Sequence, residues 1–261
     1  MHIVVVHNWQ KDEVTVANTI AGILGVLVYE TRQRIAGGGP AVLASFADLL
    51  QAEGLAARLS QASVPALVID REGVRKRSQP FHVRRFVLEA QTMQLEGVGG
   101  ELCTIDYCTM DYLLVAVCYA QTPGTATVTE RKFSLGKTLL AGGIPMSRKV
   151  TREEAVISYV RDETLWLYAQ NRGIAVFSRA ALNFDGLGAA MELTRELNFS
   201  LLKNELRHRV APAVYDERLL NRAALLRLLG PALSPETDLD LAFEILVQTL
   251  RAKPPGNAES R

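Results

Sequence analysis

Residues 25–69 have the sequence GVLVYETRQRIAGGGPAVLASFADLLQAEGLAARLSQASVPALVI, and they decide the fold of the first part of the chain. Val28–Ile35 predicts a short helix. The glycines 37–39 and Pro40 end this helix, because glycine accepts left-handed geometry and proline cannot continue a helix. A strand is expected over 41–46. Asp48 is then a natural N-cap for a helix whose apolar stripe ends near Ala62, and a third strand follows over 65–70.

The residues before this stretch add one strand and one helix. His2–His7 is apolar and predicts a strand. Asp12 and Glu13 stand where a helix would begin, since negative charge is favoured at its positive end. Apolar residues then recur at helical spacing until Gly25 breaks the pattern. The predicted order is βααβαβ, a three-stranded sheet with helices.

This order resembles the C-terminal domain of the ribosomal stalk protein and the adaptor of the Clp protease, which share a fold. The likeness covers about 70 of the 261 residues and consists of element order and glycine placement. The functional residues of these families do not carry over. Val26–Tyr29 stands where the stalk domain has its lysines. The adaptor's helix-two histidine has no counterpart in Thr31–Arg34, although HNWQKDE offers Asn8, Asp12 and Glu13 after strand one.

Residues 71–85, REGVRKRSQPFHVRR, are interpreted as a linker, since six residues are basic, one is acidic and Pro80 lies among them. Such a stretch is usually a solvated connection, and it is also able to meet nucleic acid or anionic lipid. We therefore predict two domains, 1–77 and 78–261.

Residues 82–184 predict a strand-rich domain, with short strands separated by turns at Gly97, Gly99 and Gly100, at 161–163 and at 171–173. A helix with Phe199, Leu202, Leu206 and Val210 on one face follows. VLEAQTMQLEGVGGELCTIDYCTMDYLLVAV and TLWLYAQNRGIAVFSRAALNFDGLG resemble bacterial pleckstrin-homology-like domains. That resemblance implies a split barrel, a bent sheet closed at one end by a helix.

Two helices, 215–229 and 237–251, are expected to complete this second domain. The predicted fold class is therefore α+β throughout. The tail KPPGNAESR is expected to be disordered.

Composition excludes several classes of protein. The net charge of +1 disfavours a specific nucleic-acid binder held by charge alone. No apolar run reaches the roughly 18 residues that span a bilayer, and the first residues lack the layout of a signal peptide, so we expect a cytoplasmic protein. Cys103, Cys108 and Cys118 fit neither a disulfide framework nor a zinc pattern and are expected to be small buried apolar residues. The four histidines are scattered, and we expect neither a metal nor a cofactor.

FSLGKTLLAGGIPMSRK, residues 133–149, contains Gly136-Lys137-Thr138, the ending of a phosphate-binding loop. A complete loop needs a glycine five residues before Gly136, where the chain has Arg131, so we predict no nucleotide binding. Ser134 and Lys137 also match the S-x-x-K pattern of penicillin-binding enzymes, but the companion motifs S-D-N and K-T-G do not occur.

The same region concentrates positive charge around the glycine-broken apolar segment LLAGGIPM. Its candidate binding residues are Arg131, Lys132, Lys137, Arg148 and Lys149, with no acid between the first and the last. Three alternatives remain open: an ordinary mobile loop, a contact with a protein partner, or a contact with an anionic lipid surface or another anion.

Both resemblances imply modules that bind proteins or lipids, so we expect a non-catalytic interaction or scaffold protein of undefined oligomeric state. Its partner would be a protein or else an anionic lipid. The alternative is a hydrolase or transferase whose site is assembled from distant residues such as His82, Asp106 and Asp111.

Overall fold

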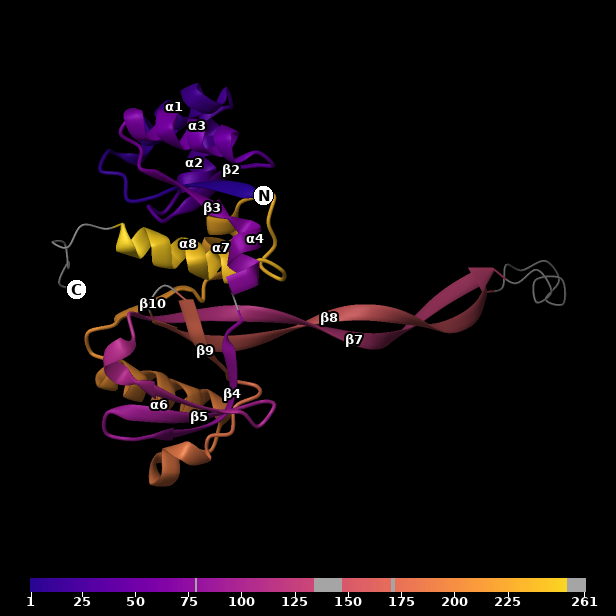
Figure 1. The fold of residues 1–261 in the computed structure, drawn as a ribbon. Helices are drawn as coiled ribbons and strands as arrows, with labels where there is room; N and C mark the ends of the chain where they lie inside the picture. The colour runs from indigo at the N-terminus through magenta and orange to yellow at the C-terminus, as the bar shows by residue number, and fades with distance from the viewer. Residues whose placement is uncertain (78, 134–146, 170–171, 253–261) are drawn as a thin grey trace, which may run out of the picture. The chain divides into compact units, whose positions relative to one another are not determined.

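The computed structural model describes residues 1–77, 79–133, 147–169 and 172–252, and gives the backbone alone for 119–133, 147–150, 153–160 and 172–173. The fold is α+β, as predicted, with a three-stranded antiparallel sheet and a seven-stranded sheet (Figure 1). Contacts divide the chain into two units: residues 1–118 together with 162–261, and residues 119–161.

The first sheet and its helices follow the predicted βααβαβ order. They comprise β1 (His2–Val6), α1 (Glu13–Leu24), α2 (Val28–Ile35), β2 (Ala41–Phe46), α3 (Leu49–Gln61) and β3 (Ala66–Asp70). The strand order is β2-β1-β3. The capping chemistry fixes the helix ends: Asp12 accepts a 3.0 Å hydrogen bond from Thr15 N, Asp48 accepts one of 3.0 Å from Leu50 N, and Gly25 closes α1 with a φ of 70°. These local signals explain why the predicted boundaries are close to those observed.

The central strand β1 is buried on both faces. Val4 and Val6 pack in one cluster with α1 and α3, whereas Ile3 and Val5 belong to another cluster with α7 (Arg222–Leu229) and α8 (Leu239–Arg251). Figure 1 shows the two helix layers on opposite sides of this sheet. Successive side chains of a strand point to opposite faces, so an unbroken apolar strand requires cover on both.

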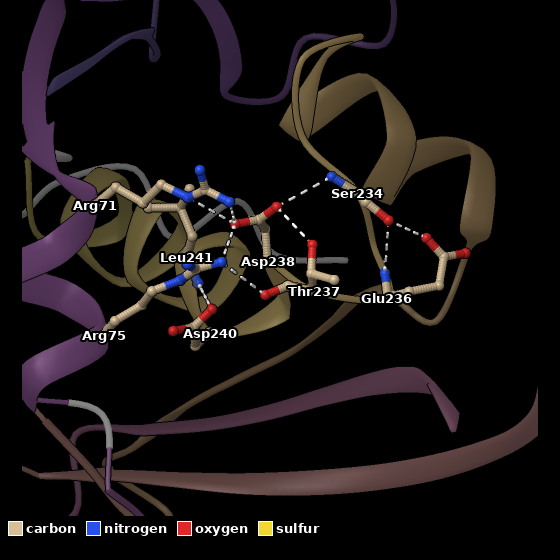
Figure 2. A network of polar contacts seen from close by, with 8 residues as sticks. All are labelled: Arg71, Arg75, Ser234, Glu236, Thr237, Asp238, Asp240 and Leu241. Atoms are coloured by element: carbon tan, nitrogen blue, oxygen red, sulfur yellow. Dashed lines mark hydrogen bonds and ion pairs between the residues drawn. The ribbon is translucent and has the colours of Figure 1, made fainter. Parts of the chain in front are cut away.

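The interpretation of residues 71–85 as a linker is wrong, because α4 (Arg71–Arg77) and the start of β4 (Phe81–Leu88) occupy most of this stretch. Val74 is buried in the same cluster as α8. Arg71 and Arg75 both bind Asp238, which precedes α8, at 2.5 Å and 3.1 Å (Figure 2). Arg71 and Arg75 therefore belong to a structural ion-pair network rather than to a solvated connection.

Asp238 is the centre of this network and is only 1 % exposed. Besides the two arginines, it accepts hydrogen bonds from Ser234 N (3.2 Å) and from the Thr237 hydroxyl (2.9 Å) (Figure 2). Burial by itself would raise the pKa of this carboxyl group, but the hydrogen bonds and the Arg71 charge outweigh it and hold the pKa below its ordinary value.

The second sheet has the strand order β10-β7-β8-β9-β4-β5-β6. Its remaining strands are β5 (Thr92–Gly97), β6 (Leu102–Asp106), β7 (Tyr112–Phe133), β8 (Ser147–Ala169), β9 (Arg172–Ser178) and β10 (Val214–Leu219). The 3-10 turns η1 (Tyr107–Thr109) and η2 (Asp185–Ala190) follow β6 and precede α6 (Arg195–Arg209), respectively. The α6 residues Phe199, Leu202 and Leu206 pack with the core of β4, β5 and β9, as the predicted apolar face requires.

Two predictions about this region are wrong in detail. The turn predicted at 161–163 does not form, because β8 continues through it. Asp162 is buried there and accepts hydrogen bonds from the Ser178 hydroxyl (2.5 Å) and Ala180 N (3.0 Å). Its carboxylate therefore stabilises the turn that follows β9. Residues 215–229 are not one helix: β10 pairs in parallel with β7, and Asn221 then caps the shorter α7.

The cysteine prediction is correct in part. All three are free thiols, but Cys108 is exposed and Cys103 and Cys118 are half-buried. Burial raises the pKa of the Cys118 thiol, which lies 3.5 Å from the Thr164 hydroxyl. Along the described residues, no helix has both the length and the apolar character that crossing a membrane would need.

Candidate functional site

The side chains predicted to bind through the 131–149 region lie outside the described residues. Arg131 and Lys132 lie near the end of β7, and Arg148 and Lys149 lie near the start of β8. The whole of Lys137 also lies outside the described residues. The roles of these residues therefore stay predictions.

The described structure does not gather the residues of the enzymatic alternative. His82 lies on β4, where its carbonyl accepts a hydrogen bond from Val98 N just after the end of β5, whereas Asp106 of β6 pairs with Thr92 at the start of β5. Asp111 follows η1, and its backbone N–H donates to Tyr168 O. Within the described ranges, no three or more His, Cys, Asp or Glu side chains are grouped closely enough to hold a metal ion.

The edge strand β6 is the feature of the second sheet that is best suited to binding. It pairs with β5 on one side and is the last strand in the sheet order. The sequence Leu102-Cys103-Thr104-Ile105-Asp106 has neither lysine nor proline, which natural edge strands use to prevent pairing with other chains. The opposite edge, β10, has three successive charged residues, 216–218, and an irregular register. Strand β6 lacks this protection.

The register shows which backbone groups of β6 face outward. Gly97 N donates to Glu101 O (2.8 Å), and Tyr107 N donates to Gln91 O (3.0 Å). Hydrogen-bonded pairs alternate along an antiparallel ladder, so Cys103 and Ile105 bond to β5 between these two points. The N–H and C=O groups of Leu102 and Thr104 therefore point away from β5, towards the open edge.

Two cavities lie along this edge, and Cys103 and Thr104 line both of them. The first, of about 390 Å³, extends over the exposed side chains of β4, β5 and β6, and its apolar wall includes Val87 and Leu102. The Leu102 side chain is 83 % exposed. The second, of about 810 Å³, is bounded by the inward-facing Ile105, by the end of α4 and by residues of β4 and β9.

The two cavities differ in chemistry. The larger one brings Lys76 and Arg77 of α4 to the same space as Glu101 and Asp106. The smaller one is mainly apolar, and its floor holds the Arg85–Glu96 ion pair of 3.5 Å. Because a strand directs successive side chains to opposite faces, a chain lying along β6 would place alternate side chains in an apolar and in a charged cavity.

Local contacts hold this groove in shape. Asn183 N donates to Arg84 O (2.8 Å), which fixes the 183–186 segment beside β4. A β-carbon on Gly186 would collide with the Phe86 carbonyl, so only glycine allows this close approach. After β6, the Tyr107 hydroxyl donates to Glu89 O (3.2 Å), and burial raises the pKa of this tyrosine.

Comparison with known proteins gives no relative from which to infer a function: no family model, curated protein or solved structure matches this chain. The sequence predicts short strands on either side of the turn near residues 97–100, but nothing in it marks the strand after this turn as a site. The missing information is the strand order, because only the sheet topology shows that β6 is an edge.

Proposed function

We propose that this protein is an interaction module that binds an extended segment of a partner protein by adding it to the sheet along β6. The observation that carries this proposal is the open edge of β6 between two cavities of different chemistry. Strand addition draws affinity from main-chain hydrogen bonds and specificity from pockets that receive alternate side chains.

The chemistry of the groove defines the partner segment. Leu102 and Thr104 offer two N–H and two C=O groups, enough for a short run of ladder hydrogen bonds. Side chains directed to the smaller cavity would be apolar, to cover Leu102 and Val87. Side chains directed to the larger one would be polar or charged, to pair with Lys76 or Asp106. The partner segment is therefore an extended one in which apolar and polar residues alternate.

Selection from a random heptapeptide library on the intact protein tests the proposal, followed by affinity measurements on the selected peptides. Thr104→Pro removes the outward N–H and leaves the bonds of β6 to β5 in place, since those come from Cys103 and Ile105. We expect at least tenfold weaker peptide binding. Thr104→Val is the matched control, because it keeps the N–H and the β-branched shape and should bind like the wild type.

Two results would overturn the proposal. One is that selected peptides bind Thr104→Pro and Thr104→Val equally well. The other is that light scattering shows a dimer that Thr104→Pro dissociates, because β6 would then be covered by a second copy of the chain. Hydrogen exchange is the direct readout for the expected mode, since bound peptide should protect the Leu102 and Thr104 amides.

A further inference from the structure

A third cavity, of about 390 Å³, has a lining that it shares with neither cavity of β6. Its wall is mainly apolar, and three arginines stand among the lining residues. It lies between the turn that follows α2 and the segment that joins β10 to α7. Its charged and glycine lining is Arg34, Gly37, Gly39, Glu217, Arg218 and Arg227. The proposed strand-binding function uses none of these residues.

The charges of this cavity leave positive charge in excess, since three arginines face one glutamate. Arg227 is exposed, and the described residues include no ion-pair or hydrogen-bond partner for its guanidinium. Arg34 gives one N–H to the Leu43 carbonyl at 3.0 Å, which leaves its other donors available.

The other two charged residues of the cavity, Arg218 and Glu217, are held in place by neighbouring side chains. Arg218 forms a 2.7 Å ion pair with Asp216, which fixes its guanidinium at the cavity wall. Glu217 accepts a hydrogen bond from the Tyr215 hydroxyl at 3.1 Å. The burial of Tyr215, assisted by the nearby Glu217 charge, raises the pKa of the phenol to about 12, so the tyrosine stays a neutral donor.

The glycine turn gives a ligand access to this wall. Gly37 and Gly38 have φ values of 91° and 70°, a conformation that side-chain-bearing residues rarely adopt. A β-carbon on Gly37 would lie 3.8 Å from Arg227 Nη2, an ordinary van der Waals distance, so the guanidinium lies beside this turn. The glycine turn therefore borders the cavity next to Arg227, in addition to ending α2.

We propose that this cavity binds the phosphate group of a small molecule. The planar guanidinium group offers paired N–H donors that match the oxygen spacing of a phosphate, and it remains charged at every physiological pH. The cavity volume is that of a small-ligand site. The ligand would bridge α2 and α7, two helices separated by almost 200 residues in the chain.

Thermal unfolding and calorimetry of the intact protein with inorganic phosphate, pyrophosphate and glycerol phosphate test this site, with chloride used to keep ionic strength constant. We expect each phosphate to raise the melting temperature and chloride alone to leave it unchanged. Arg227→Gln should weaken phosphate binding at least tenfold. Arg32→Gln is the matched control: this exposed arginine is on the same helix as Arg34 but does not line the cavity, and its loss should change nothing.

A second variant separates the cavity from general electrostatics. Ala224→Phe fills the space from α7 without changing any charge, and it should abolish binding while the protein still shows a cooperative melting transition. The proposal is wrong if 10 mM phosphate fails to stabilise the wild type. It is also wrong if Arg227→Gln and Arg32→Gln weaken binding to the same extent, since the effect would then be that of net charge.

Discussion

At the scale of single residues, Asp238 is the buried charge on which the contacts of α4 and α8 converge (Figure 2). A charge so deeply buried is tolerated only while its partners remain. Sequence analysis did not identify this pair, because Arg71 and Asp238 are 167 positions apart and each is unremarkable in its own segment. An arginine-rich stretch has the same composition whether solvent or a buried carboxylate neutralises it.

The first prediction concerns this residue. Asp238→Ala should lower the free energy of unfolding by about 3 kcal/mol, because it leaves Arg71 without its partner in a partly buried place. Urea denaturation at pH 7 measures the loss. Asp240→Ala, which removes the next acidic residue along the chain, is the control. It should lower the free energy of unfolding by less than about 1 kcal/mol, the size of the effect of a charge at a helix start.

The pH dependence of the same residue has a definite sign. The pKa of Asp238 is lower in the folded protein than in the unfolded chain, so its contribution is complete above the unfolded pKa of about 4. It is lost as pH falls through the folded pKa. The stability difference between wild type and Asp238→Asn should therefore be constant from pH 5 to 7 and shrink below pH 4. A difference that grows on acidification would contradict this assignment.

At the scale of helices and strands, the sequence predicts most accurately the boundaries that neighbouring residues determine. The helices α1 and α3 are capped by the side chains of Asp12 and Asp48. The sequence predicts the first start from the acidic charge of Asp12 and Glu13, and the second from Asp48 as an N-cap. β10 was mistaken for the start of a helix because its pairing partner β7 lies about 100 residues earlier. Pairing at such a distance overrides local helical spacing and cannot be inferred from a window of neighbouring residues.

The second prediction concerns the element that sequence analysis placed incorrectly. Asn221 ends the β10 segment and caps α7, where its side-chain oxygen accepts hydrogen bonds from Ala223 N (2.9 Å) and Ala224 N (3.3 Å). Asn221→Ala should reduce stability by about 1 kcal/mol, and Asn221→Asp should retain most of it. The melting temperatures of the two variants check this. Equal losses would mean that the cap does not set the start of α7.

At the scale of the whole molecule, neither candidate site could be predicted from the sequence. The strand-binding site depends on the position of β6 in the sheet order, and the phosphate site joins Arg34 to Arg227 across most of the chain. Both depend on tertiary contacts rather than on motifs. The likeness of the two halves to stalk-type and pleckstrin-homology-like domains also stays a prediction, as does independent folding on either side of residue 77.

The last prediction uses the cluster that crosses this boundary. Phe243 of α8 is fully buried, lies 4.4 Å from the Trp166 ring, and belongs to the same cluster as Ile3 of β1 and Val74 of α4. Phe243→Ala should lower stability by about 3 to 5 kcal/mol through the cavity that it leaves. Because the cluster is shared, hydrogen exchange should accelerate in β1 as well as in β8.

Phe184→Ala, in the separate core that α6 covers, is the matched control. It should accelerate hydrogen exchange in β1 only as much as the global loss of stability requires. Calorimetry of the wild type should show one transition if the shared cluster couples the two sheets. Two transitions, with only the later part of the chain affected by Phe243→Ala, would show that residues 1–77 fold independently of α8. In that event the cluster would be a docked interface between two domains, and the ion pairs of Asp238 would act as its polar rim.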